Sequence, residues 1–496
     1  MFQLLGEANL RSVLETSILL FVCCVWTPLV LFPKLPQEAV ALASSGFGLT
    51  ALFYLGKRGE LPAKWKEEIV RPTSIDSGLL YGTSLVSMSF AAHMLHEGES
   101  DSGTARINFW CSIGNLINFG WLLVFPHHPS PIRVLGSACV VLGFSGRVEY
   151  VICALGICEL CLQLGMRGLK KSFTLGELLL VVQYFGLCTC DMVFYSIARF
   201  PTRNGVDLAV EFGVLGCVWL AAWLIPFFRQ SPGQVDPIRF YLASAVFLGG
   251  VISPLAFWVL GMNPIWFVRD FTFSTLDHMY LLAYWCLVLA VALPLIHSRV
   301  KHLPLVVIRK LYHILALVLF APAIHFTRSF LGLGFGVATG LALIIEYVRA
   351  CHVPPLGAWL DKYMRAYTDD RDDGIFILTH LYLLVGCACS VWATQSNEGM
   401  AAYGGVLILG AGDAAAAIVG SQFGKHPWLS TGRKTIEGTV SGFLAVLLCS
   451  ELVFESDLNR TQLVLASLAT LVLEAFTTQI DNLVLPIVFT SLLRLF

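Results

Sequence analysis

The residues of this chain that could do chemistry are concentrated after position 300, at or near the ends of long apolar segments. Asp413 lies in the segment 410–420, whose other residues are Gly, Ala, Ile and Val. Farther along, five polar residues recur at helical spacing among Leu, Val, Ile and Phe: Glu474, Thr477, Thr478, Asp481 and Asn482. This spacing predicts one polar stripe on a single helix that faces the interior of a helix bundle.

Carboxylates in apolar segments need partners. An unpaired carboxylate costs about 2.5–3.5 kcal/mol at the centre of a membrane span, so several together would cost on the order of 10 kcal/mol. The set comprises Glu346, Asp413, Glu437, Glu474 and Asp481. We expect a bound metal ion and nearby Arg and Lys side chains to compensate these charges.

A short basic loop follows the Asp413 segment. Within ten residues it holds three cations and a histidine, flanked by small residues: Lys425, His426, Arg433, Lys434, Thr435, Gly420, Gly424 and Gly438. Fixed cations beside glycine amides and a helix N-terminus suit a polyphosphate. The loop is not a Walker A motif, because three residues rather than four separate Gly420 from Gly424, the glycine before Lys425. A plain basic loop beside the membrane, with glycines that let helices pack closely, would fit the same residues.

Two further charge groups lie at the ends of apolar segments. Arg309 and His313 are spaced to share one face of a helix, as are Glu346 and Arg349. Apolar residues then recur at helical spacing over 356–367, opposite a charged face. This pattern predicts one amphipathic helix lying in the membrane interface.

These residues must be positioned by membrane-embedded helices. Of 496 residues, 56% are hydrophobic and only 13% are charged, which excludes a soluble protein, and a net charge of −1 makes nucleic acid an unexpected partner. Recurrent apolar runs predict an all-α, polytopic transmembrane bundle of about 15 to 17 spans plus the interfacial helix. The spans include 238–260, 275–297, 308–325, 331–348, 461–480 and two short ones within 132–165.

The distribution of charge predicts two parts and an orientation. Residues 1–300 form N-terminal transmembrane helices that serve as a scaffold or accommodate a lipid, and residues 301–496 form a catalytic transmembrane domain. Six alternate loops hold 21 of the 32 Lys and Arg residues, so the positive-inside rule makes their side cytosolic.

Carboxylates beside a basic, Gly-rich loop point to a Mg²⁺–nucleotide site at the membrane surface. Phosphoryl transfer needs metal and cations to neutralise the phosphates and a carboxylate to orient or deprotonate the attacking hydroxyl. A site built from span ends predicts a lipid acceptor. The pattern separates a kinase from a nucleotidyltransferase only weakly, and a secondary transporter would also carry carboxylates inside the membrane.

Several motifs, in order along residues 300–496, resemble a known family. The Gly-Asp-Ala at Asp413 and the run Lys434-Thr435-Ile436-Glu437-Gly438-Thr439 are similar to the CTP-dependent polyprenol kinases, distant relatives of phosphatidate cytidylyltransferases. The segments 309–313, 370–384 and 474–486 resemble the dolichol kinase family among them. For residues 1–300 the likeness rests on length and hydropathy.

The resemblance implies transfer of the γ-phosphate of CTP to dolichol at the cytosolic face of the endoplasmic reticulum membrane, giving dolichyl phosphate for protein glycosylation. The alternative is a cytidylyltransferase that makes a CDP-lipid. Lys425, Arg433 and Lys434 would bind the phosphates, within a CTP segment that also includes Gly420, Gly424, His426, Thr435 and Gly438. The catalytic set would be Asp413, Glu474, Asp481 and Glu437, with Asp413 and Asp481 as ligands of a divalent cation, Mg²⁺. Arg309, His313, Glu346 and Arg349 would line the acceptor end. Oligomeric state is not readable from the sequence.

Overall fold

The structure, a computed structural model, is built from α-helices. The described residues are 7–45, 78–95, 102–125, 128–198, 205–231, 233–299, 302–365, 374–394, 399–429, 434–453, 460–477 and 479–495. Within these ranges the β-structure is confined to an isolated bridge between Pro427 and Thr435. The predicted all-α class is therefore confirmed.

The N-terminal helices form one packed group. They are α1 (Glu7–Leu19), η1 (Leu20–Trp26), α2 (Thr27–Leu31), α5 (Leu79–Met94), α6 (Ser102–Val124), α7 (Ser130–Ser145), α8 (Val148–Gly168) and α9 (Leu175–Ala198). The helices α5, α6 and α9 pack on one another, and α8 packs on α9. Gly146, with φ of 69°, ends α7 before α8 begins, so the region predicted to hold two short spans contains two helices. Of these, α8 has 21 residues and is long enough to cross a membrane, and α7 is shorter.

The middle of the chain contributes six further helical elements. They are α10 (Gly205–Phe228), α11 (Pro237–Phe247), η2 (Leu248–Ile252), α12 (Ser253–Leu260), α13 (Pro264–Thr272) and α14 (Leu276–Arg299). Only 6% of the continuous span Pro237–Leu260 and 11% of Leu276–Arg299 are buried within the protein. Most exposed residues of these two spans are apolar, which suits contact with a bilayer.

The last third begins with α15 (Leu305–Ala350), which contains both predicted spans 308–325 and 331–348. Thr327, with φ of −147° and ψ of 64°, interrupts the helix between them. The following helix, α16 (Gly357–Arg365), lies within the predicted amphipathic segment. The remaining elements are α17 (Thr379–Ala393), α18 (Gly399–Ala402), α19 (Gly404–Leu407), η4 (Ile408–Asp413), α20 (Ala414–Phe423), α21 (Ile436–Val453), α22 (Arg460–Phe476) and α23 (Asp481–Leu495).

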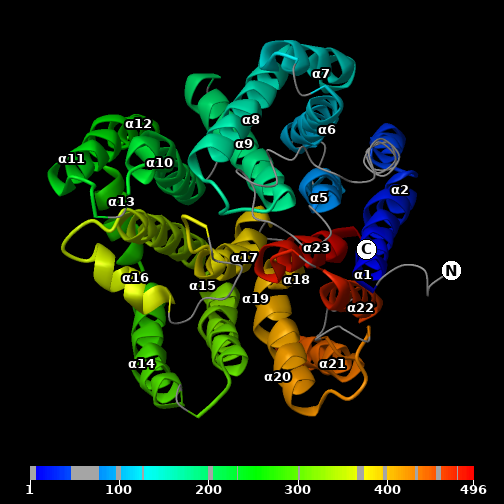
Figure 1. Cartoon of the computed structure of the whole chain (residues 1–496), viewed down its shortest axis with the longest axis vertical. Helices are drawn as coiled ribbons and strands as arrows, with labels where there is room; N and C mark the ends of the chain where they lie inside the picture. The colour runs from blue at the N-terminus through cyan, green and yellow to red at the C-terminus, as the bar shows by residue number, and fades with distance from the viewer. Residues whose placement is uncertain are drawn as a thin grey trace.

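The C-terminal helix α23 lies at the centre of the molecule. All of its residues after Asp481 are buried, and it packs against α5, α17, α19 and α22. Figure 1 shows it, in red, between the blue N-terminal helices and the orange α20 and α21. One hydrophobic core runs from Leu19 to Leu495, so the two halves share their interior. The functional division at residue 300 stays a prediction.

Nine helices in the described parts of the chain are long and apolar enough to cross a membrane. The longest, α15, holds two of the predicted spans, and Ser130–Ser145 and Thr379–Ala393 are shorter apolar helices. The chain is thus a multi-pass membrane protein by length and composition of its helices. The number of 15 to 17 spans stays a prediction.

Candidate active site

Asp413 lies at the junction of η4 and α20, about midway along the span Gly404–Phe423. Its side chain is fully buried. Oδ2 contacts the ammonium of Lys310 and lies 3.1 Å from Nδ1 of His313, both on the first turns of α15. The preceding turns are π-helical, a feature that is frequent at functional sites because it re-aims side chains. The predicted compensation of Asp413 by nearby cations is present.

The tautomer of His313 follows from its neighbours. Nδ1 lies 3.3 Å from the carbonyl oxygen of Leu409 as well as beside Asp413 Oδ2. Both neighbours accept hydrogen bonds, so Nδ1 carries the proton. The ring is thereby fixed between α15 and η4, and its pairing with Asp413 brings these two elements together.

Lys434 is positioned by a narrow loop between α20 and α21. Trp428 N donates to Lys434 O at 3.1 Å, and Ile436 N donates to His426 O at 2.9 Å. The ammonium of Lys434 contacts Oε1 of Glu474, a buried residue of α22. Burial alone would lower the pKa of Lys434, but the negative charges of Glu474, Asp413 and Asp481 outweigh it and raise that pKa. Lys434 therefore remains protonated at neutral pH.

The predicted single polar stripe over Glu474–Asn482 is wrong. The helix α22 ends at Phe476 and α23 begins at Asp481, so the stripe is divided between two helices. Between these helices, the backbone groups of Thr477 and Ile480 bind partners elsewhere in the chain. Thr478 lies outside the described residues. The break places Glu474 in the last turn of one helix and Asp481 in the first turn of the next.

These side chains form one charged cluster from four parts of the chain. Asp481 acts electrostatically on His313, Glu474 and Lys434, and Lys434 also acts on Asp413. The three carboxylates of Asp413, Glu474 and Asp481 outnumber the two ammonium groups of Lys310 and Lys434 by one. A polyphosphate entering this cluster would meet excess negative charge, which a divalent cation would neutralise.

One carboxylate oxygen of the cluster is open to a ligand such as a magnesium ion. Oδ1 of Asp413 is buried and makes no hydrogen bond in the structure. In the described part of the chain, no group of three or more His, Cys, Asp or Glu side chains is close enough to hold a metal ion. Mg²⁺ is commonly bound by one or two carboxylates together with substrate phosphates, so Asp413 and Asp481 as its ligands stay a prediction.

The glycines of the predicted nucleotide loop lie where α20 and α21 cross closely. A Cβ on Gly438 would lie 2.7 Å from the carbonyl oxygen of Ala416, and one on Gly424 would lie 2.6 Å from Oγ1 of Thr435. A Cβ on Gly420 would lie 3.0 Å from the same hydroxyl oxygen. Close helix packing is thus their observed role, with Thr435 filling the space. Their binding of a nucleotide stays a prediction.

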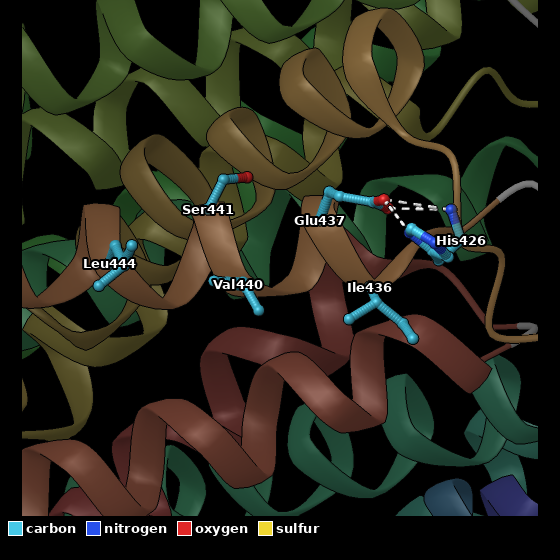
Figure 2. A pocket seen from close by; sticks show the side chains of 6 residues that line it. All are labelled: His426, Ile436, Glu437, Val440, Ser441 and Leu444. Atoms are coloured by element: carbon cyan, nitrogen blue, oxygen red, sulfur yellow. Dashed lines mark hydrogen bonds and ion pairs between the residues drawn. The ribbon is translucent and has the colours of Figure 1, made fainter.

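Glu437 and His426 form a separate, exposed pair. Nδ1 of His426 lies 2.6 Å from Oε1 of Glu437, and His426 N donates to both carboxylate oxygens at 3.2 Å. Figure 2 shows the two side chains pointing toward one another at the edge of a pocket of about 520 Å³. The rest of the lining comes from α21: Ile436, Val440, Ser441 and Leu444.

Glu346 and Arg349 form another cluster. Arg349 donates two hydrogen bonds to the Glu346 carboxylate, at 2.7 and 2.8 Å, one to Asp361 Oδ1 at 2.5 Å and one to the carbonyl oxygen of Ile375 at 2.6 Å. Glu346 also accepts from Ile377 N at 2.6 Å. The pair therefore fastens α16 and the segment before α17 to α15. The predicted contact of this pair with the acceptor stays a prediction.

The other predicted residues are placed as follows. Arg309 is half-buried in the first turns of α15, and Lys425 is exposed after α20. Arg433 lies outside the described residues. Sequence reasoning assigned no role to Lys310, although its position three residues before His313 puts both on one helix face. That spacing was the available signal for the Lys310–Asp413 contact.

Comparison with known proteins gives a family match for this chain. The family model described as "Dolichol kinase" matches residues 139–453, more than half of the chain. The chain belongs to the dolichol kinase family. Dolichol kinase of Mus musculus is 34% identical over 352 residues, which cover 66% of this chain and 66% of that protein. Dolichol kinase of Homo sapiens is 31% identical over 399 residues, covering 72% and 74%, respectively.

A plant relative, "Dolichol kinase EVAN" of Arabidopsis thaliana, is 35% identical over 282 residues, covering 54% of this chain and 50% of its own. No solved structure was found to match. The family region begins at residue 139, so the likeness to dolichol kinases reaches farther toward the N-terminus than the motifs after residue 300 indicated. It contains Lys310, Asp413 and Lys434 and ends before Glu474.

Proposed function

We propose that this protein is a CTP-dependent dolichol kinase of the endoplasmic reticulum membrane, with its site on the cytosolic side. The product, dolichyl phosphate, would supply the carrier lipid for protein glycosylation. Membership of the dolichol kinase family supports phosphorylation of dolichol. The observation that carries the proposal is the convergence of Asp413, Lys310, Lys434 and Glu474 in one cluster between membrane helices.

In this proposal the cations bind and orient the phosphates of CTP. Lys434 is a protonated donor beside the cluster, and Lys425 and Arg433 belong to the same loop. The ammonium group of Lys434 can bind a phosphate oxygen in place of the Glu474 carboxylate, because it has three hydrogen-bond donors. Lys310 would act in the same way from α15, while holding Asp413 in its buried position.

Asp413 and Asp481 would hold Mg²⁺, which supplies charge neutralisation at the transferred phosphoryl group when it is bound. Glu474 or Asp481 would accept the proton of the dolichol hydroxyl, since a carboxylate that orients the nucleophile is the usual need of phosphoryl transfer. His313 is poorly suited to that role, because its Nδ1 proton already bonds Asp413 and Leu409 O. It would fix the Asp413 carboxylate instead.

The acceptor would arrive from the bilayer. The pocket beside Glu437 opens on the outer face of α21, where Val440 and Leu444 are exposed and apolar. An isoprenoid chain can follow such a face while its hydroxyl stays near the polar end of the helix. Glu346 and Arg349 would contribute by holding α16 at the membrane interface, with Arg309 and His313 at the start of α15.

The decisive test is a labelled-CTP assay on the purified protein in lipid nanodiscs. Dolichol, retinol, phytol and phosphatidate would be offered as competing acceptors. Label from γ-labelled CTP should enter dolichol, and label from α-labelled CTP should not. Incorporation of α-label would show a cytidylyltransferase instead, and absence of lipid labelling with either nucleotide would overturn the proposal. Asp413→Asn and Lys434→Ala should abolish the γ-label transfer.

A further inference from the structure

The break between α22 and α23 is held in place by residues from the N-terminal half of the chain. It separates Glu474 from Asp481, the two carboxylates that reach the cluster from this side. Helix ends leave backbone N–H and C=O groups without partners inside the helix, and buried groups of this kind must find partners elsewhere. The partners of this break come from α1 and α9, hundreds of positions away in sequence.

Arg11 of α1 binds the C-terminal end of α22. Its Nε donates to the carbonyl oxygen of Phe476 at 2.9 Å, and its Nη2 donates to that of Thr477 at 2.7 Å. One turn later on α1, Glu15 accepts a hydrogen bond from the hydroxyl of Thr477 at 3.0 Å. A cation at a helix C-terminus also interacts favourably with the helix dipole. The two side chains therefore fix where α22 stops.

The N-terminus of α9 binds the other side of the break. Thr174 and Glu177 form a capping box: Glu177 N donates to Thr174 Oγ1 at 3.2 Å, and Thr174 N donates to Glu177 Oε2 at 3.0 Å. Each side chain has a second bond outside α9. Glu177 Oε1 accepts from Ile480 N at 3.3 Å, and the Thr174 hydroxyl donates to Gln479 Oε1 at 2.7 Å.

Glu177 thus supplies the hydrogen-bond acceptor that the N-terminus of α23 lacks in its own sequence. Ile480 is its N-cap, since its carbonyl oxygen accepts from Val484 N at 3.2 Å. In an ordinary capping box a Glu or Gln three residues later would accept from the N-cap N–H, but Leu483 occupies that position. Gly78 lies so close to Gln479 that a Cβ there would be 2.3 Å from its Oε1. The N-terminal half therefore contacts the break through α1, the N-terminus of α9 and Gly78.

We infer that Arg11, Thr174 and Glu177 are positioning residues for the active site, which hold Thr477, Gln479 and Ile480 and so set the placement of Glu474 and Asp481. This inference rests on the proposed function. It gives residues 1–300 a direct part in the site rather than a role as scaffold or lipid channel alone. Figure 1 shows α1 beside α22, as the contacts between the two helices require.

The test uses the full-length protein in nanodiscs and two readouts. Thr174→Val removes the hydroxyl and keeps the side-chain shape, Thr174→Ser keeps the hydroxyl, and Arg11→Met removes the cation. The control is Asn263→Ala, which removes the N-cap of α13, a helix that packs on α10, α12 and α15. Hydrogen exchange is followed for the backbone amides of residues 474–482, and kcat and KM are measured for dolichol with CTP.

We expect Thr174→Val and Arg11→Met to speed exchange in this segment and to lower kcat by about tenfold to a hundredfold, as small misplacements of catalytic groups do. KM for dolichol should stay unchanged in these two variants. Thr174→Ser should keep the wild-type kcat, and Asn263→Ala should change neither readout. Unchanged exchange, or faster exchange with wild-type kcat, would overturn the inference. If the wild-type protein phosphorylates no dolichol, the proposed function fails, and the exchange data decide separately whether the N-terminal half holds the break.

Discussion

Lys434 and Glu474 form an ion pair across forty positions of sequence, between the loop that precedes α21 and the last turn of α22. Glu474 is buried, and Lys434 is partly open to the surface. The pair therefore connects a surface loop with the interior of the bundle. A phosphate approaching along the loop would reach this ammonium group before the buried carboxylates behind it.

Replacement of Lys434 tests this relationship. Lys434→Ala leaves the Glu474 carboxylate buried without its cation, which should cost about 1–3 kcal/mol of stability as well as the transfer activity. Adding Glu474→Gln to that variant removes the buried charge and should restore most of the stability, but not the activity. Thermal unfolding in nanodiscs and γ-label transfer from CTP measure the two effects. Retained transfer in Lys434→Ala would exclude Lys434 from phosphate binding.

Lys310 should be as important as Asp413, although sequence reasoning assigned it no role. Lys310→Met keeps the length of the side chain but removes the only ammonium group that contacts Asp413 within the described residues. We expect loss of phosphoryl transfer by two orders of magnitude or more, on the scale of removing one preorganised electrostatic group, about 10²–10³-fold. Lys362→Met, on the exposed face of α16, is the matched control. Equal activity of the two variants would contradict a role for Lys310 in the cluster.

The attachment of α16 should depend on pH in the acid range. Partial burial tends to raise the pKa of Asp361, but hydrogen bonds from Arg365 and Arg349 outweigh it and hold the pKa below its ordinary value. A carboxyl group with a lowered pKa in the folded state contributes stability above its unfolded pKa of about 4 and loses it as the pH falls through the folded value. The melting temperature should therefore decrease as the pH is lowered below about 4.

Asp361→Asn provides the comparison. This variant should melt lower than the wild type at neutral pH, because Arg349 and Arg365 lose a charged partner. The difference between the two proteins should shrink as the pH is lowered from 6 toward 3, since the wild-type carboxylate is then protonated. A difference that stays constant over this range would mean that Asp361 does not carry the effect.

Local spacing in the sequence predicted the parts of the site that lie within one helix. Glu346 and Arg349 pair across three residues of α15, as their spacing indicates. The break after Phe476 could not be predicted in this way, because residues 474–482 keep helical spacing throughout. What ends α22 is Arg11, 465 and 466 positions away, and what caps α23 is Glu177, 303 positions away. Contacts of that range are set by the packing of the whole bundle.

The close crossing of α20 and α21 gives a last prediction, which separates packing from nucleotide binding. Gly442 lies on α21 one turn beyond Gly438, and a Cβ there would be 2.6 Å from the carbonyl oxygen of Gly412. Because that neighbour is backbone, Gly442→Ala must push the two helices apart, at a cost of about 1–3 kcal/mol. Gly213→Ala in α10 is the control, since its Cβ would meet no atom within 4 Å and alanine favours a helix.

Melting temperature and KM for CTP together distinguish the roles of these glycines. Gly442→Ala should lower the melting temperature, and Gly213→Ala should leave it unchanged or raise it. Gly438→Ala meets the carbonyl oxygen of Ala416 at 2.7 Å, so it should destabilise the protein to a similar degree. If Gly438 also lies against the nucleotide, its variant alone should raise KM for CTP. The two glycines make the same kind of contact but differ in their distance from the basic loop. Equal KM values in the Gly438 and Gly442 variants would therefore assign both glycines to helix packing.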